Sequence, residues 1–397
     1  MSSPRFTFFT LIVIVAIAGI SQGLTLPLLA IVLEERGVSS IANGMNAAAL
    51  YIGMILVSPW LEIPLRRIGY RTTIFYGLML ITVATVLLPF FEHLAIWFFL
   101  RLLLGIGDSA LHYSSQMWVT KIASPETRGR DISLYGLAFG VGFSIGPLAL
   151  NLLPYGIWAP FAALAATYVI AFLMVAKLKN EYPEMPAQTE KGKNRYVTVF
   201  GLAWWALIPS FIYGYLESSL NGSFPIYALR IGVSVESVSI ILSSFVIGSI
   251  LLQMPIGSLS DRIGRKKVMG ICAFIGAIAF LLFPLAGQSV WLMMTLLAIA
   301  GAAVGSFYSL GLAYAADILP TSLVPTAGVI ASMNYSLASI TGPTANGYVF
   351  EYLQPWMIFG LIGGLLGLFS LLGFFFREGK ERRQHEAGLS PRINRMQ

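Results

Sequence analysis

Long, continuously apolar runs recur along almost the whole chain, and this recurrence restricts the fold more than any other feature. Of the 397 residues only 11% are charged, whereas a soluble domain carries roughly 25%. Inside a bilayer every backbone polar group needs an internal partner, so membrane-crossing segments are helices or closed barrels. The runs are too long and too evenly apolar for barrel strands, which alternate in polarity. The sequence therefore predicts an all-α integral membrane protein with many spans.

Twelve transmembrane helices are predicted, and the first run is too long for the apolar core of a signal peptide. The spans cover residues 6–33, 41–62, 73–91, 94–120, 132–155, 157–176, 199–227, 235–257, 268–286, 289–316, 324–349 and 354–376. One long, charged connection, residues 177–198, separates six spans from six. We therefore expect a six-helix bundle over 1–176, a cytoplasmic linker over 177–198, a second bundle over 199–378 and a cytoplasmic tail over 379–397.

Lys and Arg residues predict the orientation, because cytoplasmic loops carry an excess of them. Nearly all of the 25 fall in alternate connections and in the two terminal segments. This pattern predicts a multi-pass protein of the plasma (inner) membrane with both termini in the cytoplasm. The net charge of +7 then follows from topology, so we expect membrane lipid and a small-molecule substrate as partners, and no nucleic acid. A monomer is expected.

The two halves resemble each other at a shift of about 195 residues. Gly37-Val38-Ser39 recurs as Gly232-Val233-Ser234, and Ile68-Gly69 as Ile263-Gly264. Gly146-Pro147 recurs as Gly342-Pro343. Together these matches predict a duplicated six-helix unit, with the halves related by a pseudo-twofold axis along the membrane normal.

One short connection between two spans, Gly257–Lys267 (G-S-L-S-D-R-I-G-R-K-K), carries one acid and four bases. We expect a turn in water at a membrane face. A basic loop that only sets orientation would explain the bases, but not Asp261 before an arginine or Gly264 between bases. The pattern resembles the signature loop between the second and third helices of each half of the major facilitator superfamily. That resemblance implies its fold, with substrate bound between two rocking halves.

The resemblance also implies a conformational latch. In the family the acid of this loop helps to hold the outward-facing state, so it assigns this role to four residues of the second half: Asp261, Arg262, Gly264 and Arg265. In the first-half copy Arg67 and Gly69 persist, but Arg66 stands at the position of Asp261. The first-half latch is therefore in doubt.

The fourth span carries a polar stripe. Arg101, Gly105, Asp108, His112 and Gln116 share one helical face. Charged groups at membrane depth usually face a cavity or a partner. Arg101-x-x-x-Gly105 resembles the family's fourth-helix motif, whose arginine is tied to proton coupling. We expect Arg101, Asp108 and His112 to form a proton-coupling group, and the alternative is an ion pair that braces the bundle.

Glu217 is the acid of the seventh span, and Gln22 occupies the equivalent position in the first. We expect Glu217 to be a protonatable carboxyl that faces the substrate. The alternative is a wet position at the outer mouth with no role in transport.

The fifth span contains Gly142-x-x-x-Gly146-Pro147, which resembles the fifth-helix motif of antiporters in the superfamily. The closing glycines of that motif are absent. Close helix packing is the alternative explanation, because small residues four apart let helices approach.

A substrate cavity of aromatic and amide side chains is expected between the halves, although most aromatic residues in such chains pack or lie in the interfacial belt. The candidate residues are Gln22, Gln116, Tyr213, Asn221, Tyr308, Asn334 and Tyr335.

Several functions are disfavoured. One cysteine and three scattered histidines form no metal site, and no phosphate-binding loop of the P-loop type is present. We expect no enzyme activity and no cofactor, with the proton gradient as energy source. The resemblance to multidrug efflux members predicts proton-coupled export of amphipathic organic compounds. A proton-coupled uptake system, a carrier for one metabolite or lipid, and a receptor-like sensor remain alternatives.

Overall fold

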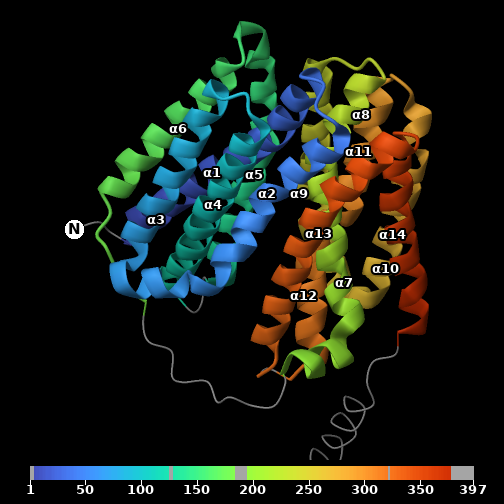
Figure 1. Ribbon diagram of the computed structural model, residues 1–397. Helices are drawn as coiled ribbons and strands as arrows, with labels where there is room; N and C mark the ends of the chain where they lie inside the picture. The colour runs from blue at the N-terminus through green and yellow to red at the C-terminus, as the bar shows by residue number, and fades with distance from the viewer. Residues whose placement is uncertain (1–3, 125–127, 184–194, 321, 377–397) are drawn as a thin grey trace, which may run out of the picture.

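The computed structural model describes residues 4–124, 128–183, 195–320 and 322–376, and all regular structure in these ranges is helical. These residues form twelve long passes, six in each of two bundles that stand side by side (Figure 1). The predicted all-α fold of two six-helix bundles is confirmed. Residues 184–194 of the predicted linker and the predicted tail, 379–397, lie outside the described residues.

The first half contains six long helices and three short 3-10 helices. They are α1 (Pro4–Glu35), α2 (Ser40–Val57), η1 (Ser58–Trp60), α3 (Glu62–Leu87), η2 (Leu88–Phe90), α4 (Leu94–Ile122), α5 (Arg128–Ile145), η3 (Gly146–Tyr155) and α6 (Trp158–Ala176). The fifth pass changes from α5 to η3 at Gly146-Pro147, because the proline nitrogen cannot donate to the helical hydrogen-bond ladder.

The second half contains two passes that are broken, although the sequence predicts them as continuous. The elements are α7 (Arg195–Gly222), α8 (Phe224–Arg230), α9 (Val235–Ile263), α10 (Arg265–Leu282), η4 (Phe283–Ala286), α11 (Val290–Val304), α12 (Phe307–Ile318), α13 (Val324–Tyr352) and α14 (Met357–Phe375). Ser223 separates α7 from α8, and Pro225, which has no N–H to donate, lies in the first turn of α8, where a proline is tolerated.

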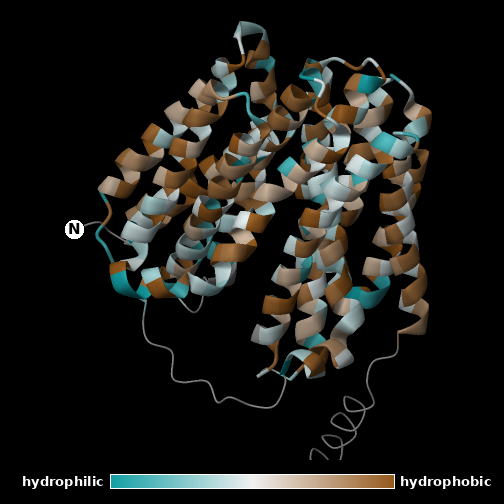
Figure 2. Cartoon of the chain, in the orientation of Figure 1, coloured by the Kyte–Doolittle hydropathy of each residue, from teal (hydrophilic) through white to brown (hydrophobic). Residues whose placement is uncertain are grey.

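Eleven helical segments of the described chain are long and apolar enough to cross a membrane. Apolar residues cover much of the length of the bundles, whereas hydrophilic residues gather towards their ends (Figure 2). The helix α13 is not among the eleven, although it has 29 residues. It packs against α7 of its own half and α2 of the other half, so protein surrounds much of a helix whose sequence is less apolar.

The repeated Gly-Val-Ser sequence has the same structure in both halves. Gly37 and Gly232 have positive φ angles of 70° and 84° after the ends of α1 and α8. Ser39 and Ser234 then cap α2 and α9 by accepting hydrogen bonds from backbone N–H groups in the first turn. The local match therefore reflects a duplicated turn.

Close helix packing is duplicated as well. A methyl group on Gly53 of α2 or Gly105 of α4 would overlap a backbone carbonyl oxygen of the facing helix. The same holds for Gly248 of α9 and Gly301 of α11, at the equivalent place in the second half. Backbones this close require residues without a Cβ atom.

The stretch Gly257–Lys267 differs from the expected turn. Helix α9 continues through Asp261 to Ile263, and α10 begins at Arg265. Only Gly264 lies between them, with a φ angle of 96° that favours glycine. The predicted span, which ended with the apolar run at residue 257, was shorter than α9, because helices in such proteins continue into water beyond the bilayer.

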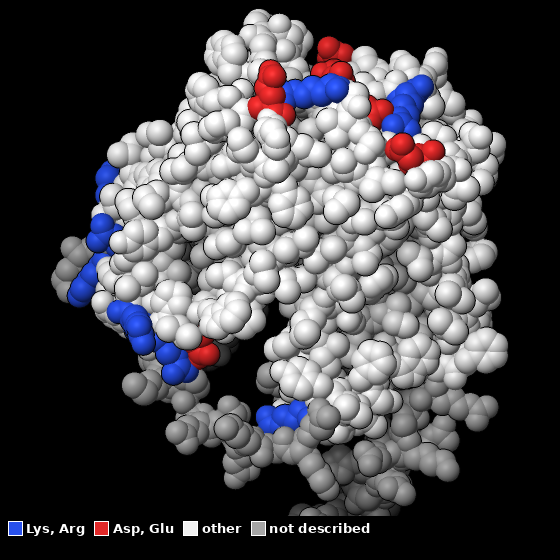
Figure 3. All heavy atoms as spheres, in the orientation of Figure 1, with Lys and Arg blue, Asp and Glu red and all other residues white. Residues whose placement is uncertain are grey.

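The halves meet at one end and part at the other. We call the end with Arg230 and the α1–α2 turn the Arg230 end, and the opposite one the Asp261 end. At the Arg230 end, Arg230 Nε lies 2.7 Å from a Glu34 carboxylate oxygen, and its Nη2 donates to Ser40 Oγ across 2.6 Å. Towards the Asp261 end, at the lower edge of the view, a hollow separates the halves (Figure 3). We call this hollow the vestibule.

Candidate functional site

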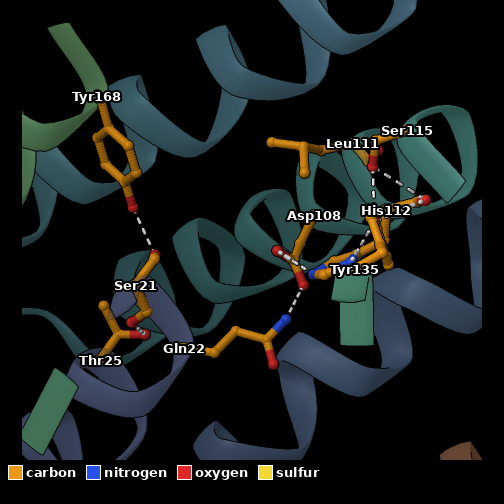
Figure 4. Close-up of polar contacts among 9 residues, drawn as sticks. All are labelled: Ser21, Gln22, Thr25, Asp108, Leu111, His112, Ser115, Tyr135 and Tyr168. Atoms are coloured by element: carbon orange, nitrogen blue, oxygen red, sulfur yellow. Dashed lines mark hydrogen bonds and ion pairs between the residues drawn. The ribbon is translucent and has the colours of Figure 1, made fainter. Parts of the chain in front are cut away.

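The carboxyl of Asp108 lies midway along α4 and is only 4% exposed. One oxygen accepts a hydrogen bond from the Gln22 side-chain amide of α1, and the other lies 3.7 Å from His112 Nε2 (Figure 4). The structure thus brings together two residues predicted for proton coupling and one predicted for the cavity.

Arg101 is separated from this group. Its guanidinium is buried, and Nη1 donates to Asn46 Oδ1 of α2 across 3.0 Å. Its Nε and Nη2 have no hydrogen-bond partner among the described residues. Seven residues place Arg101 and Asp108 about 10 Å apart along the helix axis. The expected Arg101–Asp108 pairing is therefore not formed in this structure.

Glu217 forms the centre of a tyrosine cluster in the second half. It is 8% exposed, and its Oε2 accepts a hydrogen bond of 3.1 Å from the Tyr335 hydroxyl of α13. The rings of Tyr213 and Tyr308 lie 6.4 Å and 6.0 Å from that of Tyr335. None of the ion pairs among the described residues includes Glu217. We call these four residues the Glu217 cluster.

Tyr51 of α2 connects the two groups, and the sequence did not single it out. It is 2% exposed and interacts electrostatically with Arg101, Asp108 and Glu217. The signal available in the sequence was weak, namely the polar Asn46 in the same apolar run. Tyr51 belongs to the first half. Its interaction with Glu217 therefore indicates that the Glu217 cluster lies close to the first bundle.

The three remaining cavity candidates have different surroundings. Asn221 donates to the backbone oxygen of Glu217 across 2.8 Å, within its own helix. Asn334 donates to the Leu207 oxygen across 3.2 Å and so braces α13 against α7. Gln116 is exposed. Only Gln116 thus presents an uncommitted amide, and it lies towards the Asp261 end.

Exposure rises towards the Asp261 end on helices of both halves. On α4, Asp108 is buried, His112 is partly exposed and Gln116 is exposed. On α13, Tyr335 is partly exposed and Ser332 is exposed. On these two helices the residues nearer the Asp261 end are thus the more exposed ones.

Two of the predicted latch residues of the second half, Asp261 and Arg265, contact each other. Arg265 bridges Asp261 at 2.9 Å and Asp317 of α12 at 2.7 Å. Asp317 was not predicted. The Asp261 side chain is 62% exposed, and its neighbour Arg262 is also exposed. Because the bridge lies within one half, the predicted role in holding an outward-facing state stays a prediction.

In the first half, the start of the predicted linker covers the eroded loop. Gly69 has a φ angle of 81°, and Arg67 is exposed. The Asn180 amide donates to the Ile68 oxygen across 2.6 Å, and Glu181 O accepts from Tyr70 N across 2.8 Å. These contacts hold the loop where the second half uses an acid and an arginine.

The fifth-span glycines pack against α1. A methyl group on Gly142 or Gly146 would overlap the backbone of α1, and one on Gly19 or Gly23 of α1 would overlap that of α5. Pro147 begins η3. The packing explanation therefore has direct support, and a role specific to antiporters stays a prediction.

Comparison with known proteins agrees with this architecture. The family model described as Major Facilitator Superfamily matches residues 11–208 and 198–392. The uncharacterized MFS-type transporter YfkF of Bacillus subtilis is 41% identical over 90% of this chain and 92% of its own length. Multidrug resistance protein 2 of the same organism is 23% identical over 88% of this chain and 90% of its own.

Solved structures share the fold. The nucleoside transporter NupG has a TM-score of 0.73 at 16% identity, over 94% of this chain and all of that chain. A bacterial homologue of the human lysosomal transporter Spinster, in an inward-facing and unoccupied conformation, has a TM-score of 0.67 at 14% identity. That match covers 93% of each chain.

Proposed function

We propose a specific role for this chain, which belongs to the Major Facilitator Superfamily. It is a secondary active transporter that exports amphipathic organic compounds in exchange for protons by alternating access. The substrate binds between the halves at the Glu217 cluster. Glu217 and Asp108 are the protonatable groups, and the proton gradient supplies the energy.

The surroundings of Glu217 carry this proposal. A carboxyl group at membrane depth is costly when it is charged and unpaired, so it binds either a proton or a cation. The Glu217 cluster offers a hydroxyl donor and three aromatic rings, and ring faces attract organic cations. A proton and a basic, apolar substrate then compete for one carboxyl, which is the physical requirement for exchange. The similarity to Multidrug resistance protein 2 supports this class of substrate.

The same proposal includes the orientation. Described basic residues of the predicted inner loops, among them Arg66, Lys121 and Arg265, lie at the Asp261 end, so this end faces the cytoplasm of a cell whose plasma (inner) membrane holds the protein. The vestibule then opens to the cytoplasm, as required for loading an exported compound. Each proton that enters along the membrane potential supplies about 2.3 kcal/mol per 100 mV.

The test uses purified protein in liposomes that contain a pH dye. After a pH gradient is imposed, the lipophilic cation tetraphenylphosphonium is added, followed by antibiotics, sugars, nucleosides and organic acids. We expect proton movement with lipophilic compounds, and a loss of at least about tenfold in rate in Glu217→Gln. Asp108→Asn is expected to uncouple protons from substrate.

Glu236→Gln is the matched control, because Glu236 is an exposed glutamate at the Arg230 end. It should transport at the wild-type rate. Undiminished proton-driven transport in Glu217→Gln would transfer the coupling role from Glu217 to Asp108.

A carrier for one polar metabolite is the second candidate. The fold of the nucleoside transporter NupG matches over nearly the whole chain, and the tyrosine rings of the Glu217 cluster offer faces on which a nucleobase can stack. Saturable flux of one nucleoside, without proton movement for lipophilic compounds, would favour this candidate and leave the two acids with structural roles.

A further inference from the structure

A chain of hydrogen bonds behind His112 has a defined direction. Ser115 donates its hydroxyl proton to the Leu111 carbonyl oxygen, 2.7 Å away. The Ser115 oxygen also lies 2.7 Å from the Tyr135 hydroxyl of α5. Either hydroxyl could donate in this second bond, and because the serine proton is already used at Leu111, we assign Tyr135 as the donor. The Tyr135 oxygen is therefore left as an acceptor.

This direction determines the tautomer of His112. Its Nδ1 lies 3.3 Å from the Tyr135 oxygen (Figure 4), and with Tyr135 assigned as the donor to Ser115 we assign the proton to Nδ1, which donates it. In a neutral imidazole the other nitrogen then carries a lone pair. That nitrogen, Nε2, is buried and has no hydrogen-bond partner among the described residues. It faces Asp108 Oδ1 at 3.7 Å.

A lone pair opposite an oxygen fits only one protonation state of Asp108. A carboxylate would repel it, whereas a carboxylic acid can donate its proton to it. A small movement of the ring, or one water molecule, closes the remaining distance. The His112 side chain is 26% exposed, against 6% for that of Asp108. The His112 side chain is thus the more exposed of the two, although its Nε2 atom is buried.

We propose that His112 carries protons between Asp108 and the vestibule, and that Tyr135, held by Ser115, is the positioning residue that keeps Nε2 directed at Asp108. In the outward step the Asp108 O–H proton passes to Nε2, giving a carboxylate and an imidazolium. Because Nε2 is buried while it faces Asp108, the imidazolium ring then swings away from Tyr135, releases the Nε2 proton to vestibule water and returns with Nδ1 still protonated. This inference rests on the proton exchange proposed above.

The other neighbours of this pair do not provide an equivalent route. The amide of Gln22 occupies the second oxygen of Asp108 from α1, and an amide does not relay protons readily. The rings of Phe139 of α5 and His112 pack in a T-shaped arrangement, with their centroids 5.1 Å apart. Tyr51 and Tyr168 interact with Asp108 electrostatically, but both are buried. His112 is the partner of Asp108 that is both basic and partly exposed.

Two measurements on the purified full-length protein test the proposal without any transported compound. Nitrogen-15 NMR of labelled histidine reports the tautomer of His112, and the signal is assigned by its loss in His112→Gln, since the chain has three histidines. Infrared spectroscopy after a pH jump follows the carboxylic C=O band that is absent in Asp108→Asn. Its rate of change reports proton exchange with water.

The expected wild-type tautomer is Nδ1–H. In Tyr135→Phe, which keeps the ring and removes the hydroxyl, the tautomers should mix, and proton exchange at Asp108 should slow by about tenfold or more. Ser115→Ala should shift both readouts in the same direction. Tyr215→Phe is the matched control, because its buried hydroxyl donates to Asn346 in the second half and contacts neither His112 nor Asp108, and it should change neither readout.

A wild-type Nε2–H tautomer, or an unchanged exchange rate in Tyr135→Phe, would overturn the proposal. The exporter hypothesis fails separately, through absence of proton-linked flux in liposomes. A protein with the expected tautomer and exchange rates but no such flux would retain the proton route and lose the proposed substrates.

Discussion

Tyr335 is the side chain that contacts the buried acid Glu217. Its hydroxyl is the side-chain donor that the structure gives to the Glu217 carboxyl. The hydroxyl of Tyr308, nearby, contacts Ser332, which is exposed. The two tyrosine hydroxyls therefore have partners that differ in burial, since Glu217 is buried and Ser332 is exposed.

Removing the first hydroxyl should cost more than removing the second. Tyr335→Phe leaves a buried carboxyl without its donor, so we expect a loss of about 1–3 kcal/mol in unfolding free energy. Tyr308→Phe should stay within about 0.5 kcal/mol. Denaturant unfolding of the purified protein in detergent measures both. Equal losses in the two variants would contradict the assigned importance of the Glu217–Tyr335 bond.

The positions of glycine residues determine how closely two helices of a pair approach each other. Gly142 lies in α5 against the backbone of α1, whereas Gly136 on the same helix has no atom within 4 Å of where its Cβ would be. The same residue type therefore serves close packing at one position and has no packing role at the other.

This contrast predicts opposite signs for one substitution. Gly142→Ala should destabilise the protein by about 1–3 kcal/mol, because the added methyl group overlaps the facing backbone. Gly136→Ala should stabilise by up to about 1 kcal/mol, since alanine favours a helix more than glycine does. Thermal unfolding of both variants is the measurement. A neutral Gly142→Ala would show that α1 and α5 can separate without cost.

At the scale of the whole molecule, the two halves are joined by polar contacts at the Arg230 end. Arg230 of the second half contacts Glu34 and Ser40 of the first, and the Ser40 N–H donates to Glu351 across 3.3 Å. Between α5 and α9, Ser243 donates to the Ser144 oxygen across 2.8 Å. These contacts hold the closed end while the vestibule is open.

Arg230→Ala should therefore shift the protein towards the state that opens at the Arg230 end. Loss of about 1–2 kcal/mol of contact changes a population ratio by roughly 5- to 30-fold. Spin labels on Glu92→Cys and Trp291→Cys, two exposed positions at that end on different halves, report the separation when Cys272 is replaced by serine. We expect longer distances between the two spin labels in Arg230→Ala than in the protein with Arg230.

Arg36→Ala is the matched control. Arg36 is an exposed arginine at the same end, but its guanidinium lies over the Trp97 ring, 4.9 Å from its centroid, within the first half. Its loss should leave the label distances unchanged. An Arg230→Ala distance distribution like that of wild type would mean that the apolar contacts alone hold the closed end.

The fold class, the two six-helix halves and the duplication could be predicted from the amino-acid sequence. Apolar run length, the periodic charge of the connections and repeated turns such as Gly37-Val38-Ser39 are local signals, and each has a physical cause within a few residues. Glu217, Asp108 and His112 could be selected for the same reason, since an ionisable residue inside an apolar run is costly wherever the helices lie.

Which of these groups meet depends on how the helices pack against one another. Asp108 contacts Gln22 of α1 and not Arg101 of its own helix, and Glu217 is held by Tyr335, more than a hundred residues later. Tyr51, Tyr135 and Asp317 carry no signal of their own, because tyrosines and acids near helix ends are common. Their roles arise from the packing of helices distant in sequence, which the periodicity of a single helix does not specify.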